Sequence, residues 1–207
     1  MGKRDLHDRY FRQAKDHGYA ARSAFKLIQI NERRKLIRKG DRVLDLGCSP
    51  GSWLQVAADL VGPGGLAVGI DLNPVRTALP AHCVALVGDI FKTPPAALLE
   101  PAGRRYDILL SDMAPSTSGT ASDHFRSVEL CDRVLELAAD LLKPGGHLAM
   151  KVFEGEAYAN LLKRTARVFD SAKGFKPEAS RDVSREIYIV ATGYKGPADR
   201  APSESDA

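Results

Sequence analysis

A glycine-rich turn between an apolar segment and an amphipathic segment constrains the fold of this chain more than any other feature. The apolar segment Val43–Leu46 leads into the turn Gly47-Cys48-Ser49-Pro50-Gly51, and helical periodicity begins at Trp53. Asp71 closes the next apolar segment, 20 residues after Gly51. In a βαβ unit, such glycines let the backbone approach a ligand closely, and the later carboxylate accepts hydrogen bonds from ribose hydroxyls. The pattern predicts a βαβ unit that binds a nucleoside-containing cofactor.

The spacing of the turn also indicates which cofactor. Gly47 and Gly51 are four residues apart with Pro50 between them, so the G-x-G-x-x-G pattern of dinucleotide enzymes is absent. This disfavours a bound pyrophosphate and favours a cofactor with one nucleoside and no phosphate, S-adenosylmethionine (AdoMet). We expect the adenosine to lie beside the turn, with Asp71 on the ribose and Asp89 near the adenine.

Alternating apolar and amphipathic segments predict a doubly wound, Rossmann-like α/β fold with a mostly parallel sheet and an antiparallel last strand. The expected strands are 42–46, 66–70, 83–87, 106–110, 147–153, 170–176 and 186–193. The expected helices are 5–16, 22–36, 53–60, a short one between 94 and 101, 123–142 and 157–168. Lys143-Pro144-Gly145-Gly146 is a typical helix stop. We divide the chain into a helical extension (1–40), one cofactor-binding domain (41–196) and a disordered tail (197–207).

Charge is distributed unevenly along the chain. Residues 1–40 contain twelve lysines and arginines but four acidic residues, a net charge of +8, whereas the whole chain carries +4 and the remainder therefore −4. A basic extension that also carries aromatic side chains is typical of a segment that binds a polyanion such as RNA. A solvated helix face would have the same composition. The candidate RNA-binding residues are Arg9, Arg12, Lys15, Arg22 and Lys26.

Several classes of protein are disfavoured by what the sequence lacks. It has no run of 18 apolar residues and no apolar signal-peptide core, so we expect a cytoplasmic protein without a membrane span. Its three cysteines are far apart, which favours free thiols in a reducing compartment. The histidines and cysteines show no metal-ligand spacing, and we expect no metal site.

Four charged residues are expected to meet at one edge of the sheet. Asp112 follows the strand 106–110, Lys151 lies near the end of the apolar strand 147–153, and Glu186 begins the last strand. Ligands of such sheets bind where the parallel strands end, and an antiparallel last strand begins at that same edge. Lys26, on the second predicted helix, can lie over it. Separately, Asp112 could be a turn cap and Glu186 a surface charge, but a lysine inside an apolar strand is uncommon without a partner.

At these motifs the chain resembles the FtsJ/RrmJ (RlmE) family of ribosomal RNA 2′-O-ribose methyltransferases. The resemblance covers residues 5 to 195, and Cys48, Ser49 and Ser52 are mild departures from it. The matching segments are Arg22–Leu27, Asp45–Trp53, Gly88-Asp89, Ser111–Pro115 with Ser118–Thr120, Lys151–Glu156 and Ser184–Gly193. The family's Lys-Asp-Lys-Glu tetrad falls on Lys26, Asp112, Lys151 and Glu186. Its AdoMet contacts fall on Gly51, Trp53, Asp71, Asp89 and Asp112.

The resemblance implies 2′-O-methylation of a uridine in the aminoacyl-site loop of large-subunit rRNA, late in ribosome assembly, by a monomeric cytoplasmic enzyme. Lys151 would accept the proton of the ribose hydroxyl, because the like charge of Lys26 and partial burial favour its neutral amine. Asp112 and Glu186 would orient it.

Other functions remain alternatives. A tRNA 2′-O-ribose methyltransferase would use the same tetrad, and a non-catalytic RNA-binding assembly factor could keep the fold. Base methylation is disfavoured because no aromatic residue follows Asp112-Met113-Ala114-Pro115. A nicotinamide dehydrogenase would need a tighter glycine pattern and a Tyr-x-x-x-Lys or histidine proton relay, which is absent.

Overall fold

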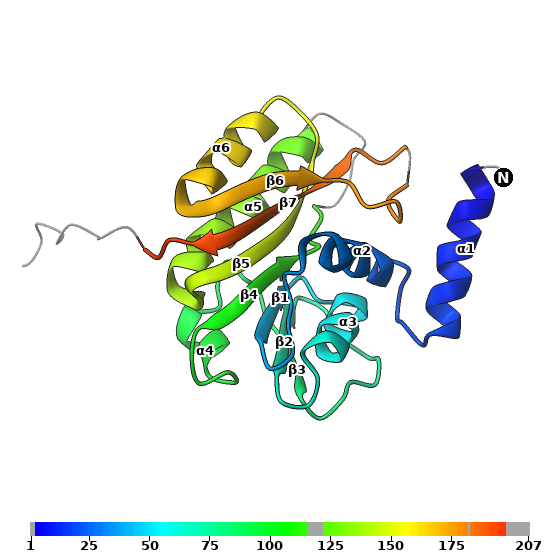
Figure 1. Cartoon of the computed structure of the whole chain (residues 1–207), viewed down its shortest axis with the longest axis horizontal. Helices are drawn as coiled ribbons and strands as arrows, with labels where there is room; N and C mark the ends of the chain where they lie inside the picture. The colour runs from blue at the N-terminus through cyan, green and yellow to red at the C-terminus, as the bar shows by residue number, and fades with distance from the viewer. Residues whose placement is uncertain (1–2, 116–121, 182, 198–207) are drawn as a thin grey trace, which may run out of the picture.

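The chain folds into one seven-stranded sheet with helices on both faces (Figure 1). The structure is a computed structural model, and it describes residues 3–115, 122–181 and 183–197. Ser118–Thr120 and most of the tail expected at 197–207 lie outside these residues. The strands are β1 (Arg42–Leu46), β2 (Leu66–Asp71), β3 (Cys83–Val87), β4 (Tyr106–Ser111), β5 (Leu142–Phe153), β6 (Phe169–Phe175) and β7 (Glu186–Tyr194). The helices are α1 (Lys3–Asp16), α2 (Ala24–Arg34), α3 (Ser52–Val61), α4 (Pro95–Leu99), α5 (Ser122–Leu141) and α6 (Tyr158–Val168).

The strand order is β3-β2-β1-β4-β5-β7-β6, in which β1 to β5 run parallel and β7 is antiparallel to both neighbours. The predicted fold class is therefore confirmed. β7, near the end of the chain, is inserted between β5 and β6, so its first residue lies beside the last residue of β5. The register pairs Phe153 with Glu186 and Lys151 with Tyr188.

Two apolar cores lie on opposite faces of the sheet. Helices α2 and α3 cover one face, where Leu27 and Leu54 pack against Val43 and Ile108. Helices α5 and α6 cover the other. β4 is buried along its whole length, as expected for a central strand, and its buried Asp107 is paired with Lys143 and Arg104. This central position fixes the end of β4, where Asp112 begins the following loop.

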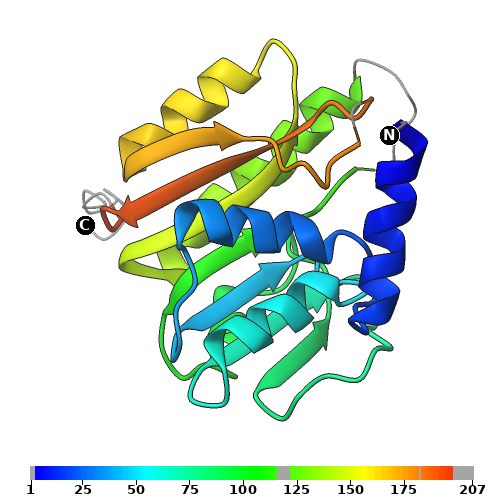
Figure 2. The same ribbon diagram turned by 45° about the vertical axis from the view of Figure 1, so that its right-hand side comes forward.

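α1 lies on the side of the molecule toward which the parallel strands run (Figure 2). Tyr10 and Ala14 of this helix are buried, and the Tyr10 hydroxyl accepts a hydrogen bond from the Gln29 amide of α2 at 2.9 Å. The Tyr10 ring lies 5.4 Å from the Phe25 ring. The basic helix is thus held near the ligand-binding edge by a small aromatic contact. Among the described residues, no helix has the length and apolar character that crossing a membrane requires.

Several boundaries differ by one or two residues from those predicted, and two of the differences have a clear cause. α2 ends at Arg34 because Lys35 adopts a left-handed conformation (φ 52°) and donates its N–H to the Asn31 carbonyl. β5 begins at Leu142, five residues early, since Leu142 already pairs with Tyr106 before the register shifts. Gly145 has a φ of 78°, as expected of the predicted helix stop, but the segment belongs to the strand. Neither difference moves the carboxyl end of the sheet.

Candidate active site

A cavity of about 560 Å³ opens at the carboxyl ends of β1, β2 and β4. Four of the six residues predicted to contact the cofactor line this cavity, namely Gly47, Asp71, Asp89 and Asp112, and Ser49 of the turn lines it as well. Three carboxylates around one cavity create a negative potential, which attracts a cation and repels a phosphate.

Asp71 joins the glycine turn to the end of β2. One of its carboxylate oxygens accepts the Ser49 N–H at 3.1 Å, and the other accepts the Asn73 N–H at 2.8 Å. Asp89 accepts the Phe91 N–H at 2.9 Å and lies 3.7 Å from the exposed Lys92 ammonium. Both carboxylates are therefore oriented by backbone donors and still face the cavity.

The two glycines of the turn leave no room for a side chain. Gly47 has a φ of +81°, and a Cβ atom there would lie 2.2 Å from Cγ of Met113. Gly51 has a φ of +114°, and its Cβ would lie 2.8 Å from the Val75 side chain. Any other residue would have to displace these neighbours and adopt a strained backbone. Gly51 supports the turn from outside, since it is absent from the residues that line the cavity.

Asp45 is a buried carboxylate beneath the turn that sequence reasoning did not single out. It is fully buried on β1, and neither of its oxygens has a hydrogen-bond partner among the described residues. Burial first, and then the charges of Asp112 and Asp71, raise the pKa of Asp45 well above its usual value. An unpaired buried carboxyl is costly, so a bound group that offers hydrogen-bond donors would fit beside Asp45.

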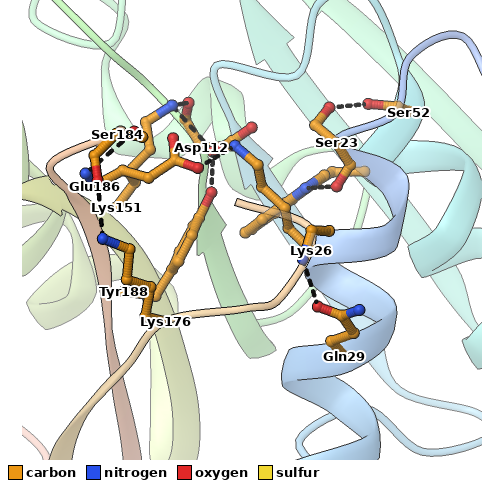
Figure 3. A network of polar contacts seen from close by, with 12 residues as sticks. Ser23, Lys26, Gln29, Ser52, Asp112, Lys151, Lys176, Ser184, Glu186 and Tyr188 are labelled. Atoms are coloured by element: carbon orange, nitrogen blue, oxygen red, sulfur yellow. Dashed lines mark hydrogen bonds and ion pairs between the residues drawn. The ribbon is translucent and has the colours of Figure 1, made fainter. Parts of the chain in front are cut away.

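The structure brings together the four charged residues that the sequence predicts to meet (Figure 3). The Lys151 ammonium lies 3.0 Å from Oδ1 of Asp112 and donates to the Asp112 main-chain carbonyl at 2.5 Å. The Lys26 ammonium lies 2.6 Å from Glu186. Lys26, Lys151 and Glu186 are each less than one-tenth exposed. The site thus consists of two adjacent, nearly buried ion pairs at the edge of the sheet.

The Glu186 carboxylate is held in its ionised form. Burial alone would raise its pKa, but the charge and hydrogen bond of Lys26, with smaller contributions from Ser180 and Lys151, outweigh burial and lower the pKa of Glu186. Lys26 and Glu186 therefore largely neutralise each other.

Tyr188 is a member of the site that sequence reasoning missed. Its hydroxyl donates to Oδ1 of Asp112 at 2.6 Å, and its ring stacks on Trp53 with centroids 5.6 Å apart. Trp53, which the resemblance assigns to the cofactor, is buried, and its indole N–H donates to the Ser23 carbonyl at 2.8 Å. Its side chain is absent from the cavity lining. The sequence did contain a signal for Tyr188: it lies two residues after Glu186 on the same strand, so the two side chains project to the same face of the sheet.

The predicted RNA-binding residues border the same edge. Arg9, Arg12 and Lys15 are exposed on α1. Burial and the nearby Arg181 guanidinium lower the pKa of Arg22, whereas Glu186 opposes them, so Arg22 lies within electrostatic range of the tetrad. A hollow of about 340 Å³ between α1 and the following loop is lined in part by Phe11, Lys15, Tyr19 and Arg22.

Comparisons with known proteins agree with this geometry. Residues 19–194 match the model of the family described as FtsJ-like methyltransferase. The chain is 47% identical over 189 residues to ribosomal RNA large subunit methyltransferase E of Desulforapulum autotrophicum, an alignment that covers 91% of this chain and 93% of that protein. It is 45% identical over 186 residues to the protein of the same name from Syntrophobacter fumaroxidans, covering 89% and 94%.

Solved structures resemble it as well. A ribosomal RNA methyltransferase from Plasmodium falciparum superposes with a TM-score of 0.75 at 28% identity, covering 86% of this chain and all of that one. Fibrillarin from Aeropyrum pernix, solved with natively bound S-adenosyl-L-methionine, gives a TM-score of 0.58 at 19% identity, covering 82% of this chain and 73% of that one; at this identity the likeness concerns the fold alone.

Proposed function

Because this chain belongs to the FtsJ-like methyltransferase family, we propose that it methylates the 2′-hydroxyl of a ribose in large-subunit ribosomal RNA. The methyl donor is AdoMet. The observation that carries the proposal is the pair of buried lysine–carboxylate contacts, Lys151 with Asp112 and Lys26 with Glu186. They lie beside a cavity whose lining residues include glycines and three carboxylates.

The residues of the cavity fit AdoMet better than a dinucleotide. AdoMet carries a sulfonium and an ammonium, and the cavity offers three lining carboxylates and no lysine or arginine among its lining residues. Asp45 lies beneath it without a hydrogen-bond donor. Asp71 would hold the ribose hydroxyls, Asp89 would lie near the adenine, and Asp112 would lie close to the sulfonium. A pyrophosphate would be repelled by the same carboxylates.

Lys151 is the proposed proton acceptor. When bound, AdoMet supplies an electrophilic methyl group, which the ribose oxygen takes as its own proton leaves. The Lys151 amine receives that proton in its neutral form, and Asp112 then stabilises the resulting ammonium at 3.0 Å. The contact from Lys151 to the Asp112 carbonyl, at 2.5 Å, fixes the direction of the amine. Positioning of the hydroxyl supplies much of the remaining acceleration.

Lys26 and Glu186 have a supporting role in this proposal. Glu186 keeps Lys26 in place, and because the two charges largely neutralise each other, the pair adds little net charge beside Lys151. Glu186 therefore contributes less to the rate than Lys151 or Asp112.

The proposed acceptor is a uridine in the aminoacyl-site loop, methylated late in the assembly of the large subunit by a monomer in the cytoplasm. The names of the relatives support the large-subunit target. The exposed cations of α1 would bind RNA phosphates. Phe11, which is 64% exposed beside the hollow under α1, would stack on an unpaired base of the same RNA.

A single-turnover assay with tritiated AdoMet tests this function. Immature large subunits and deproteinised ribosomal RNA would be compared with tRNA, all from cells that lack the protein, and labelled nucleotides would be mapped. We expect 2′-O-methyluridine at one large-subunit position. Label in tRNA alone would favour the tRNA enzyme, and RNA binding without any label would favour a non-catalytic assembly factor.

A further inference from the structure

Tyr188 and Lys151 share one oxygen of Asp112. The Tyr188 hydroxyl donates to Oδ1 at 2.6 Å, and the Lys151 ammonium lies 3.0 Å from the same atom (Figure 3). The shorter of the two contacts is made by a neutral phenol. The contact between the two charged groups is therefore made at an oxygen that already accepts a hydrogen bond.

The position of the phenol is set by the sheet. Tyr188 on β7 is the direct register partner of Lys151 on β5, and directly paired residues project to the same face. The Tyr188 side chain is fully buried, and its ring is held against Trp53. Burial, followed by the charges of Asp112 and Glu186, raises the pKa of Tyr188 well above its usual value. The hydroxyl therefore stays protonated, and remains a donor, throughout the working pH range.

A donor on Oδ1 weakens the attraction of Asp112 for the Lys151 ammonium. Hydrogen bonds to a carboxylate stabilise its charge and reduce what it offers to a second partner. The other charged groups near this point are Asp45 from β1, Lys26 from α2, Glu186 from β7 and, beside Glu186, Arg22 from the segment before α2. Lys26 and Glu186 are paired with each other, and burial raises the pKa of Asp45 well above its usual value, which favours its neutral form. Asp112 is thus the carboxylate that decides how firmly the proton stays on Lys151.

We propose that Tyr188 is a positioning residue that, by donating to Oδ1 of Asp112, keeps Lys151 available as a proton acceptor near neutral pH. This inference rests on the proposed function, because it assumes that the neutral Lys151 amine takes the proton of the ribose hydroxyl. Tyr188 touches neither substrate nor cofactor in this scheme and acts only through Asp112.

The discriminating variant is Tyr188→Phe, which keeps the ring and its stacking on Trp53 but removes the donor. Without that donor, Asp112 holds the Lys151 proton more firmly, so a higher pH is needed to release it. The matched control is Tyr106→Phe. Tyr106 is equally buried, and its hydroxyl donates at 2.5 Å to the Leu98 carbonyl, on β4 away from the tetrad. Both variants lose one buried hydrogen bond, but only one of those bonds reaches Asp112.

Single-turnover methylation of immature large subunits would be measured for wild type and both variants between about pH 6 and pH 10. We expect the acid limb of the Tyr188→Phe profile to move up by about 0.5 to 1 pH unit, with a three- to tenfold slower rate on that limb and recovery at high pH. Tyr106→Phe should keep the wild-type limb. An NMR titration of the Lys151 side-chain amine should show the same upward movement in Tyr188→Phe without any RNA.

Three outcomes would overturn the inference. The first is that the acid limb of the Tyr188→Phe pH–rate profile does not shift. The second is that Tyr188→Phe lowers the rate equally at every pH. The third is that Tyr188→Phe fails to fold although Tyr106→Phe folds, which would make the Tyr188 hydroxyl a structural element. Absence of ribose label with the wild-type protein is a different result: it contradicts the proposed function, whereas the NMR titration still tests the link between Tyr188 and Lys151.

Discussion

The Lys26 ammonium lies 2.6 Å from the Glu186 carboxylate. This ion pair joins α2, which covers one face of the sheet, to the inserted strand β7. We predict that Glu186→Gln destabilises the protein by about 2–4 kcal/mol at neutral pH, because it leaves the buried Lys26 charge without a counter-charge. Chemical denaturation measures this. Lys26→Met combined with Glu186→Gln should recover part of the loss, and additive effects of the two changes would contradict the pairing.

The pair also predicts a pH dependence of stability. The folded-state pKa of Glu186 lies below its unfolded value, with Lys26 outweighing burial, so its stabilisation is fully present above the unfolded pKa. It is lost as the pH falls from about 4.5 through the lower folded pKa. The stability difference between wild type and Glu186→Gln should therefore shrink in acid. A difference that stays constant down to pH 3 would argue against an ionised Glu186.

Lys151 should be indispensable for the rate. Lys151→Ala is expected to fold and bind AdoMet but to lose methyl transfer by about two to four orders of magnitude, the usual scale for a general base. Lys151→Arg should fail as well, since a guanidinium stays protonated and cannot accept. Single-turnover rates provide the measurement. Near-normal activity of Lys151→Arg would mean that the residue acts only as a fixed cation.

Asp71 should contribute to cofactor affinity. Asp71→Ala removes the proposed acceptor of the ribose hydroxyls and also the carboxylate that orients the turn through Ser49. We expect AdoMet to bind about ten- to a hundredfold more weakly, or about 1.5–3 kcal/mol, in calorimetric titration. Unchanged affinity would refute the assignment, and tighter binding of a nicotinamide dinucleotide than of AdoMet would refute the cofactor.

The cations of α1 should bind RNA through its phosphates. Replacing Arg9, Arg12 and Lys15 by alanine should lower RNA affinity and flatten the log–log salt dependence by about one unit per lost contact, with AdoMet affinity unchanged. A triple alanine variant of Lys163, Arg167 and Lys173, exposed on α6 and β6, removes the same charge elsewhere and serves as the control. If the two triple variants lowered RNA affinity equally, the cations of α1 would be an ordinary solvated helix face and not an RNA-binding site.

The Phe11→Ala variant tests the contribution of base stacking to RNA binding separately from that of charge. Phe11→Ala should weaken RNA binding by about 1–3 kcal/mol while leaving the salt slope unchanged, because base stacking releases no counterions. Filter binding at several salt concentrations provides both quantities. A variant that binds RNA as wild type does would show that the hollow beneath α1 holds no base.

The sequence is most informative about this protein where the order of strands decides which residues meet. Lys151, Asp112 and Glu186 could be placed at one edge because parallel strands end together and an antiparallel strand begins there. Tyr188 was missed because tyrosine is an ordinary residue of a buried strand, and only its distance to Asp112 gives it a role. Trp53, which the resemblance assigns to the cofactor, also packs its ring on Tyr188, a contact that only the folded structure shows.

Asp45 and the start of β5 depend on information that local patterns do not contain. A single aspartate in an apolar strand could have had a buried partner, and its lack of one is visible only in three dimensions. The early start of β5 results from pairing of Leu142 with Tyr106 across a register shift, a long-range contact that overrides a local helix-stop signal.

β7 is inserted between β5 and β6 although it comes last in sequence among the described strands. Residues 186–194 are translated after β1 to β6, so a growing chain lacks both Glu186 and Tyr188 until β7 has been made. We therefore expect chains that end before residue 186 to transfer methyl groups more slowly than the full chain, even where β1 to β5 have formed.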